Sequence, residues 1–284
     1  MADRELDVRL LAACAIAREA GGLARRHFQA RPAALQLDFK GDQDYVSATD
    51  AEVETLIRRR LEDAFPDDSF YGEEGGGAFG RDAWLVDPID GTANFMRGIP
   101  MFCVSIAFVR DGRGEIGVIY DPVHDELYGA RRGAGASLDG APIGVSGLTD
   151  IRQATIEAGW STRLPPDPYA ALVLSLKQEG AGVRRGGSGA LALAYVAAGR
   201  IDAYCELHMN AWDALAGLVL VEEAGGWVSD FLAGDGLTRG NPILACTPAL
   251  ADVLAGAMDL ASPGGGGRDR EAIQVRGETR RWRT

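Results

Sequence analysis

Residues 84–92 read Trp-Leu-Val-Asp-Pro-Ile-Asp-Gly-Thr, an apolar run followed by two acids, a turn and a hydroxyl. The apolar run predicts a buried strand that stops at Asp87-Pro88, because proline has no amide proton to donate to a sheet. Gly91 allows the backbone to come close to a ligand. Thr92 stands where the next helix would begin, and the amides at a helix start favour an anion such as phosphate. We therefore expect a ligand site at the end of this strand.

The two acids of this stretch, Asp87 and Asp90, are candidate metal ligands. Carboxylates and an exposed main-chain carbonyl at Ile89 are hard oxygen donors, which suit Mg²⁺ or Mn²⁺ better than zinc. The alternative is that Asp90 caps a helix beside a surface acid, Asp87. Two further acids favour the metal hypothesis, because Glu73 follows a predicted strand and Asp213 stands where a helix opens after a strand. Ligands of α/β sheets gather at such junctions, although Asp213 alone would also fit a plain helix cap.

Apolar periodicity predicts the elements of the first half. Helices are expected over residues 5–28 and from near Asp50 to a point before Pro66, with a short strand at Ser69–Tyr71. The glycine-rich residues 75–80 are predicted to form a flexible loop. From Phe102 to about Asp139, short β-branched segments alternate with turns, which is typical of an antiparallel meander.

Helical and extended patterns alternate after about residue 149 and predict a second α/β lobe with a mixed sheet. The expected helices are 188–198 and 213–224, and the expected strands are 201–205 and 226–229. We predict an N-terminal α+β lobe over residues 1–148, a C-terminal α/β lobe over 149–261 and a mobile Arg-rich tail over 262–284.

Composition and charge argue against several classes of protein. The 284 residues carry a formal net charge of −12, which repels nucleic acid and anionic lipid, so neither is an expected partner. Apolar runs fall short of the ~18 residues that a membrane helix needs. The four cysteines are scattered without a CxxC pair, which is typical of free thiols in a reducing cytosol, and we expect a cytoplasmic protein.

Three short motifs are false signals. The pattern Gly75-x-Gly77-x-x-Gly80 precedes a strand and does not open a helix, so a dinucleotide fingerprint is not expected. The two lysines, Lys40 and Lys177, follow no Walker-type glycine loop. The three histidines have no zinc-binding spacing.

Several stretches together resemble the inositol monophosphatase family. Residues 84–95 (WLVDPIDGTANF) and 212–217 (WDALAG) are similar to its two signatures, and Gly72-Glu73-Glu74 is similar to its metal-bridging acid motif. The stretch from Lys40 through Asp44 to Asp50 resembles the family pattern K…D-x-V-T-x-x-D, with Ser47 in the usual threonine place. The resemblance covers about residues 5–257.

This resemblance implies a layered αβαβα sandwich of the sugar-phosphatase type and a lithium-sensitive phosphomonoesterase that requires two to three Mg²⁺ ions. It also implies a homodimer. The implied metal ligands are Glu73, Asp87, the Ile89 carbonyl, Asp90 and Asp213. The residues implied to activate water are Asp50, Glu73 and Thr92. The residues implied to bind phosphate or the rest of the substrate are Asp90, Gly91, Thr92, Gly189, Glu206 and Asp213, with Lys40 near the phosphate or a mobile loop.

The expected reaction is the hydrolysis of a small phosphorylated substrate, inositol-1-phosphate, to inositol and phosphate. Residues 91–100 (GTANFMRGIP) and Glu206 favour it over nucleotide-cleaving relatives. Histidinol phosphate is the alternative substrate on the same scaffold, ahead of fructose-1,6-bisphosphate and adenosine 3′,5′-bisphosphate. An alternative of another class is a regulatory or scaffold protein that binds a transcription or ribosome-related partner, but the complete set of acids argues against a binding-only protein.

Overall fold

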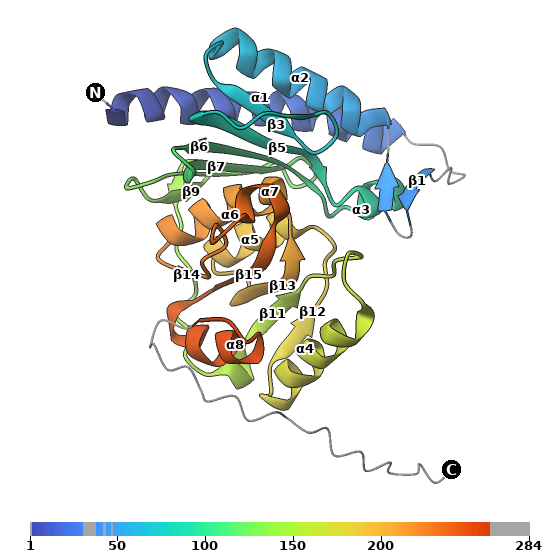
Figure 1. Cartoon of the computed structure of the whole chain (residues 1–284), viewed down its shortest axis with the longest axis vertical. Coiled ribbons are helices and arrows are strands. Elements are labelled where there is room, and N and C mark those ends of the chain that lie inside the picture. The colour runs from blue at the N-terminus through green and yellow to red at the C-terminus, as the bar shows by residue number, and fades with distance from the viewer. Residues whose placement is uncertain (1, 31–37, 42–43, 47, 262–284) are drawn as a thin grey trace.

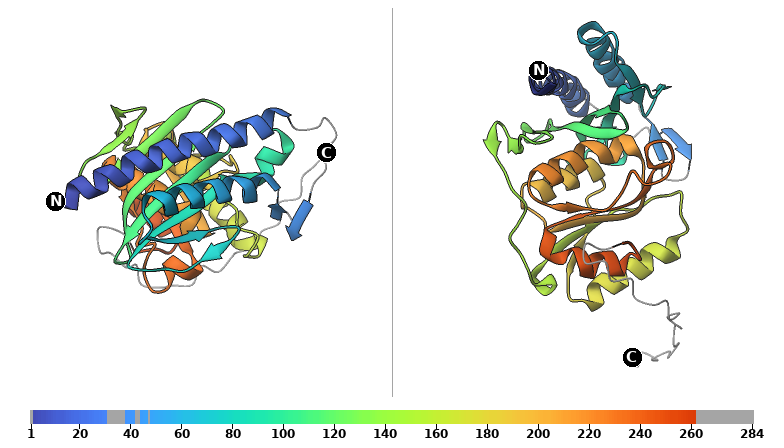
Figure 2. Two further views of the ribbon diagram at one scale, coloured as in Figure 1. Left: turned by 90° about the horizontal axis from the view of Figure 1, so that it is seen from above. Right: turned by 60° about the vertical axis from the view of Figure 1, so that its left-hand side comes forward.

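The protein is a stack of layers in which two β-sheets are separated and covered by helices (Figure 1). The computed structural model describes residues 2–30, 38–41, 44–46 and 48–261. One helix pair covers the first sheet, a second pair lies between the sheets, and a third covers the second sheet (Figure 1; Figure 2). The predicted αβαβα sandwich is therefore confirmed. The predicted tail, residues 262–284, lies outside the described residues.

The helices are α1 (Ala2–Ala30), α2 (Ala48–Ala64), α3 (Thr92–Arg97), α4 (Pro166–Gln178), α5 (Gly189–Ala197), α6 (Ala211–Glu223), α7 (Gly236–Arg239) and α8 (Ala251–Ala257). The strands of the first half are β1 (Asp38–Gly41), β2 (Asp44–Val46), β3 (Ser69–Gly72), β4 (Gly76–Gly77), β5 (Asp82–Asp90), β6 (Cys103–Arg110), β7 (Arg113–Asp121), β8 (Glu126–Arg131), β9 (Ala136–Leu138) and β10 (Ala141–Pro142). Those of the second half are β11 (Thr155–Ala158), β12 (Gly182–Arg184), β13 (Ala203–Met209), β14 (Trp227–Val228) and β15 (Asn241–Cys246).

The first sheet has eight strands in the order β10-β9-β8-β7-β6-β5-β3-β4. Strands β5 to β9 form consecutive antiparallel pairs, which confirms the predicted meander. Strand β3 lies parallel to β5, with Gly72 opposite Val86. Because parallel strands end at the same edge of a sheet, this pairing brings Glu73 next to Asp87.

Both faces of this sheet are buried. Along β5, Trp84 and Val86 pack in the core beneath α1 and α2, whereas Ala83 and Leu85 pack in the core shared with α5 and α6. Alternation along a strand sends successive side chains to opposite faces. The continuous apolar run is therefore the pattern of a strand between two helix layers.

The second sheet is mixed, as predicted, with the order β12-β11-β13-β15-β14. Strand β11 lies parallel to β12 and β13, and β15 is antiparallel to β13 and β14. A third core lies between this sheet and the outer helices α4 and α8. Helix α6 lies close to β7 because Gly117 has no side chain, and a Cβ there would overlap the main-chain carbonyl of Ala216.

Two local predictions were wrong. Strand β5 does not stop at Asp87-Pro88 but continues to Asp90 through an irregularity in its pairing with β6. Strand β3 pairs with β5 only as far as Val86, so Pro88 interrupts no ladder on that side, and proline is tolerated at such irregular positions. The predicted loop 75–80 contains the short strand β4.

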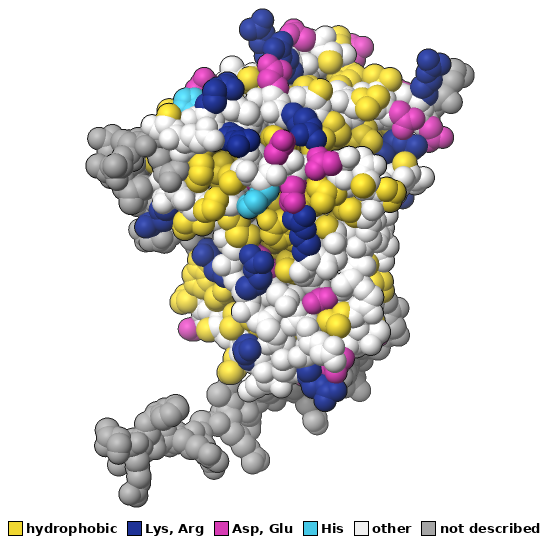
Figure 3. Space-filling view, turned by 180° about the vertical axis from the view of Figure 1, so that it is seen from behind, with side chains coloured by type: hydrophobic (Ala, Val, Ile, Leu, Met, Phe, Trp, Pro, Cys, Tyr) yellow, Lys and Arg dark blue, Asp and Glu magenta, His cyan; other side chains and the backbone are white. Residues whose placement is uncertain are grey.

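None of the helices in the described ranges combines the length and apolar character that a membrane crossing requires. Basic and acidic side chains are interspersed over the face shown in Figure 3. The boundary between lobes near residue 148 stays a prediction.

Candidate active site

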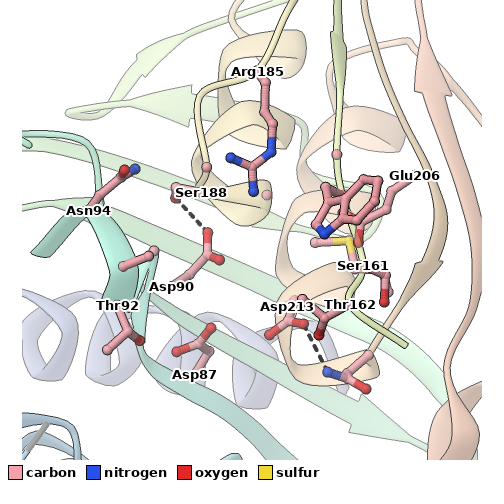
Figure 4. A pocket seen from close by; sticks show the side chains of 18 of the residues that line it. Asp87, Asp90, Thr92, Asn94, Ser161, Thr162, Arg185, Ser188, Glu206 and Asp213 are labelled. Atoms are coloured by element: carbon pink, nitrogen blue, oxygen red, sulfur yellow. Dashed lines mark hydrogen bonds between the residues drawn. The ribbon is translucent and has the colours of Figure 1, made fainter. Parts of the chain in front are cut away.

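A cavity of about 700 Å³ opens where the end of β5 meets the first residues of α3, α5 and α6 (Figure 4). Its lining includes most of the site residues predicted from sequence, namely Glu73, Asp87, Ile89, Asp90, Gly91, Thr92, Gly189, Glu206 and Asp213. Residues separated by up to 140 positions in the chain therefore face one space. Side chains of residues 31–47, including Lys40, are not described.

Three carboxylates converge at one end of this cavity. Glu73 follows β3, Asp87 lies in β5 and Asp213 lies in the first turn of α6. One oxygen atom from each lies within 4.8 Å of the other two, an arrangement that can hold a metal ion. Oxygen ligands of this kind match the preference of Mg²⁺.

The cluster carries an electrostatic cost in the absence of a cation. Burial raises the pKa of Asp87 well above its usual value, and the charges of Glu73 and Asp213 raise it further. Loss of water contact, together with the charge of Asp90, raises the pKa of Asp213 to about 7. A divalent cation would remove this repulsion.

Asp90 lies beside the cluster but is bound to a helix start. Its Oδ2 accepts a hydrogen bond from Ser188 Oγ at 2.5 Å (Figure 4). The same oxygen accepts one from the Ala190 amide at 2.7 Å. Desolvation raises the pKa of Asp90, and these hydrogen bonds oppose the rise. The acid therefore binds the first turn of α5, a helix that begins almost a hundred residues after it, and not α3, which follows it directly. Asp90 as a metal ligand stays a prediction.

Thr92 connects the buried acid Asp50 to the end of β5. Its hydroxyl lies 3.1 Å from Asp50 Oδ1 and 3.0 Å from the carbonyl oxygen of Ile89, and it donates toward these acceptors. Asp50, in the first turn of α2, is fully buried. A hydroxyl that donates to a carboxylate keeps lone pairs with which it can accept a hydrogen bond from water.

Gly91 precedes α3 with a φ of 96°, in the left-handed region where glycine is favoured. A Cβ at this position would lie 3.0 Å from the carbonyl oxygen of Met101. Both the backbone angle and this contact explain why glycine occupies position 91. Helix α3 begins at Thr92, as predicted.

The opposite wall of the cavity carries Glu206, which accepts a hydrogen bond from the Tyr204 hydroxyl. Desolvation raises the pKa of Glu206 to about 7, and the tyrosine opposes the rise. Gly189, at the start of α5, lines the same wall. This wall therefore offers the Glu206 carboxylate and the Tyr204 phenol to the part of a ligand that lies away from the three carboxylates.

Sequence reasoning missed several residues of the site. Tyr204 could have been found, because it precedes Glu206 by two positions in a strand and so shares its face. Asn94 donates to the carbonyls of Met101 and Gly186 at 2.7 and 2.8 Å, and thereby connects α3 with the loop before α5. No local signal pointed to Ser188 as the partner of Asp90.

The fold and the clustered carboxylates beside a threonine at a helix start are those of a phosphomonoesterase whose acids can bind metal ions. The chain belongs to the inositol monophosphatase family, whose sequence model matches residues 5–260. It is therefore a phosphoric monoester hydrolase, of a family that is magnesium-dependent in general.

Two curated relatives and one solved structure illustrate the similarity. The chain is 43% identical over 226 residues to the inositol-1-monophosphatase of Rhizobium meliloti, covering 78% of this chain and 85% of the relative. It is 43% identical over 222 residues to the Nus factor SuhB of Xylella fastidiosa, covering 77% and 80%. The crystal structure of the extragenic suppressor protein suhB from Bartonella henselae aligns with a TM-score of 0.80 at 36% identity, covering 91% of this chain and 98% of that one.

Proposed function

We propose that this protein hydrolyses inositol-1-phosphate to inositol and inorganic phosphate. The observation that carries the proposal is the convergence of Glu73, Asp87 and Asp213 next to the Thr92–Asp50 pair. The proposed metal ligands are Glu73, Asp87, the Ile89 carbonyl, Asp90 and Asp213, for two to three Mg²⁺ ions.

Bound Mg²⁺ would supply a water of lowered pKa and neutralise negative charge on the phosphate. The chain's own residues orient that water. Thr92 Oγ1 donates its proton to the carboxylate of buried Asp50, so its lone pairs can accept a hydrogen bond from a water on the cavity side. A proton that this water gives up to Thr92 would be matched by the threonine proton passing to Asp50. Glu73, at the edge of the same cavity, provides a second acceptor for that water.

The substrate has two ends, and the cavity offers different chemistry to each. The amides of Gly91 and Thr92 would contact the phosphate beside the acids. The alcohol would face the other wall, which Gly189 also lines and where the Glu206 carboxylate can accept hydrogen bonds from ring hydroxyls. A polyol matches such acceptors better than an apolar alcohol does. The name of the Rhizobium meliloti relative supports the same substrate.

Phosphate release from a substrate panel tests this proposal. The panel contains inositol-1-phosphate, histidinol phosphate, fructose-1,6-bisphosphate and adenosine 3′,5′-bisphosphate, each assayed with Mg²⁺ and with excess EDTA. We expect the highest kcat/KM for inositol-1-phosphate and no measurable release in EDTA. Faster release from histidinol phosphate would instead assign the alternative substrate.

The name Nus factor, carried by the Xylella fastidiosa relative, supports the second, regulatory function considered above. The two functions are compatible, because the described cavity retains its acids. Biological activity that persists in a catalytically inactive variant would favour the regulatory function. The homodimer and the cytoplasmic location stay predictions.

A further inference from the structure

We infer that Glu54, an acid on α2 that lies outside the cavity, is a positioning residue that holds Glu73 in place for cation binding. The inference rests on the proposed function, because it presumes that Glu73 is a metal ligand. It concerns a part of the structure that the mechanism above does not use.

The side chain of Glu54 is buried beneath the turn that carries Glu73. Only 5% of it is exposed. Its Oε2 accepts a hydrogen bond from the Glu74 amide at 2.8 Å, and its Oε1 accepts one from the Gly75 amide at 2.9 Å. One carboxylate therefore binds the two amides that immediately follow Glu73.

Arg58, one turn later on α2, extends this contact. Its Nη2 lies 3.3 Å from Glu54 Oε1 and donates to the carbonyl of Gly76 at 3.0 Å. The guanidinium also lies over the ring of Phe70 in β3, 4.0 Å from its centroid. Arg58, on the same helix, thus fixes the Glu54 carboxylate while that carboxylate binds the turn after Glu73.

The turn is also fixed from the other side. The amide of Glu73 donates to the carbonyl of Val86 in β5 at 3.1 Å, one residue before Asp87. Three successive amides, those of residues 73, 74 and 75, therefore have fixed acceptors. The first acceptor belongs to the strand of one cluster acid, and the other two belong to Glu54.

The position of Glu73 depends on these turn contacts more than the positions of Asp87 and Asp213 do. Asp87 lies in a central strand and Asp213 in a helix, so regular backbone hydrogen bonds fix both. Glu73 lies in the turn between β3 and the two-residue strand β4, next to glycines. The separation among the three carboxylates therefore depends on what fixes this turn.

The glycines before and after Glu73, Gly72 and Gly75, leave the space that the Glu54 carboxylate occupies. A Cβ on Gly72 would overlap the Glu54 carboxylate, and a Cβ on Gly75 would lie 2.6 Å from Glu54 Oε1. The pattern Gly-Glu-Glu-Gly at residues 72–75 thus leaves room for a carboxylate that approaches from α2.

The test measures Mg²⁺ affinity by isothermal titration calorimetry, together with kcat and the melting temperature of the metal-free protein. The variants are Glu54→Gln, which keeps the shape but places an N–H group against an amide, and Glu54→Asp, which keeps the charge but shortens the reach. Glu62→Gln is the matched control, because Glu62 is an exposed acid on the same helix. Outer-shell partners of metal ligands typically change affinity or activity about 10–100-fold. We expect a loss of at least about tenfold in Mg²⁺ affinity in both Glu54 variants and none in the control.

Two results would overturn the inference. Unchanged affinity in Glu54→Asp would mean that only the charge matters, and a lower melting temperature with unchanged affinity in both variants would mean that Glu54 only stabilises the fold. Should neither variant fold, Gly72→Ala tests the same contact from the turn, because its Cβ must displace the carboxylate. Wild-type affinity in Gly72→Ala would contradict the inference too. Failure of the proposed function has a different signature, since Asp87→Asn would then also keep wild-type affinity.

Discussion

Replacing Asp87 by asparagine should lower kcat by at least about a hundredfold while the protein stays folded. The substitution removes a charge from the proposed metal site, whose cation would stabilise the transition state. Asp87 Oδ1 accepts a hydrogen bond from the Ile89 amide at 2.9 Å, and an asparagine oxygen can accept the same bond. The local geometry at the end of β5 should therefore survive the change.

Loss of the charge should also benefit the metal-free protein. Burial and the neighbouring acids hold the pKa of Asp87 well above its usual value, so the ionised side chain is unfavourable there. We expect the melting temperature of Asp87→Asn in EDTA to equal or exceed that of the wild type. Asp111→Asn is a suitable control, because this turn residue has a φ of 51°, which asparagine tolerates. Near-wild-type kcat in Asp87→Asn would remove this residue from the site.

Magnesium should raise the melting temperature, and the gain should increase with pH. A ligand at a hundred times its dissociation constant stabilises the folded state by about 2.7 kcal/mol. A domain of about this size shifts by roughly 2–4 °C per kcal/mol, so we expect a rise of about 5–10 °C at pH 7.5. Differential scanning fluorimetry in EDTA and in saturating Mg²⁺ measures it, with NaCl at matched ionic strength as the control.

The sign of the pH effect follows from the raised pKa of Asp213, which is about 7 in the folded protein against 3.8 ordinarily. Between these values the folded state binds more protons than the unfolded state, so metal-free stability falls as pH rises through this window. Cation binding requires ionised carboxylates, so the stabilisation by Mg²⁺ grows over the same range. Asp213→Asn should flatten the metal-free pH dependence. Equal melting temperatures with and without Mg²⁺ at every pH would contradict the cluster.

Sequence patterns predicted most of the fold because most elements carry a local signal. Short β-branched segments separated by turns predicted the meander, and 3.6-residue periodicity predicted the helices over the first sheet. Irregularities in strand pairing depend on neighbouring strands and are therefore not visible in a local pattern. The extension of β5 past Pro88 depends on β3 ending at Gly72, and no feature of residues 84–92 shows where the neighbouring strand ends.

In the candidate site too, some features were visible in local sequence and others depend on tertiary packing. The acids of residues 84–92 were identified as candidate metal ligands from the residues themselves, and the resemblance implies the same role. The approach of Glu73 to Asp87 depends on the parallel pairing of β3 with β5, which a sequence pattern does not specify. The contacts of Asp90 with α5 and of Glu54 with the Glu73 turn join segments about 100 and 20 residues apart through single side chains. Such contacts follow from tertiary packing and leave no periodic signal.

Glu73, Asp87 and Asp213 together should bind a divalent cation. Anomalous diffraction from a crystal of this protein grown with Mn²⁺, which accepts the same oxygen ligands as Mg²⁺, tests this binding. We expect an anomalous peak within ligand distance of all three carboxylates. An ordered cavity without a peak at saturating Mn²⁺, or a peak bound by other residues, would contradict it.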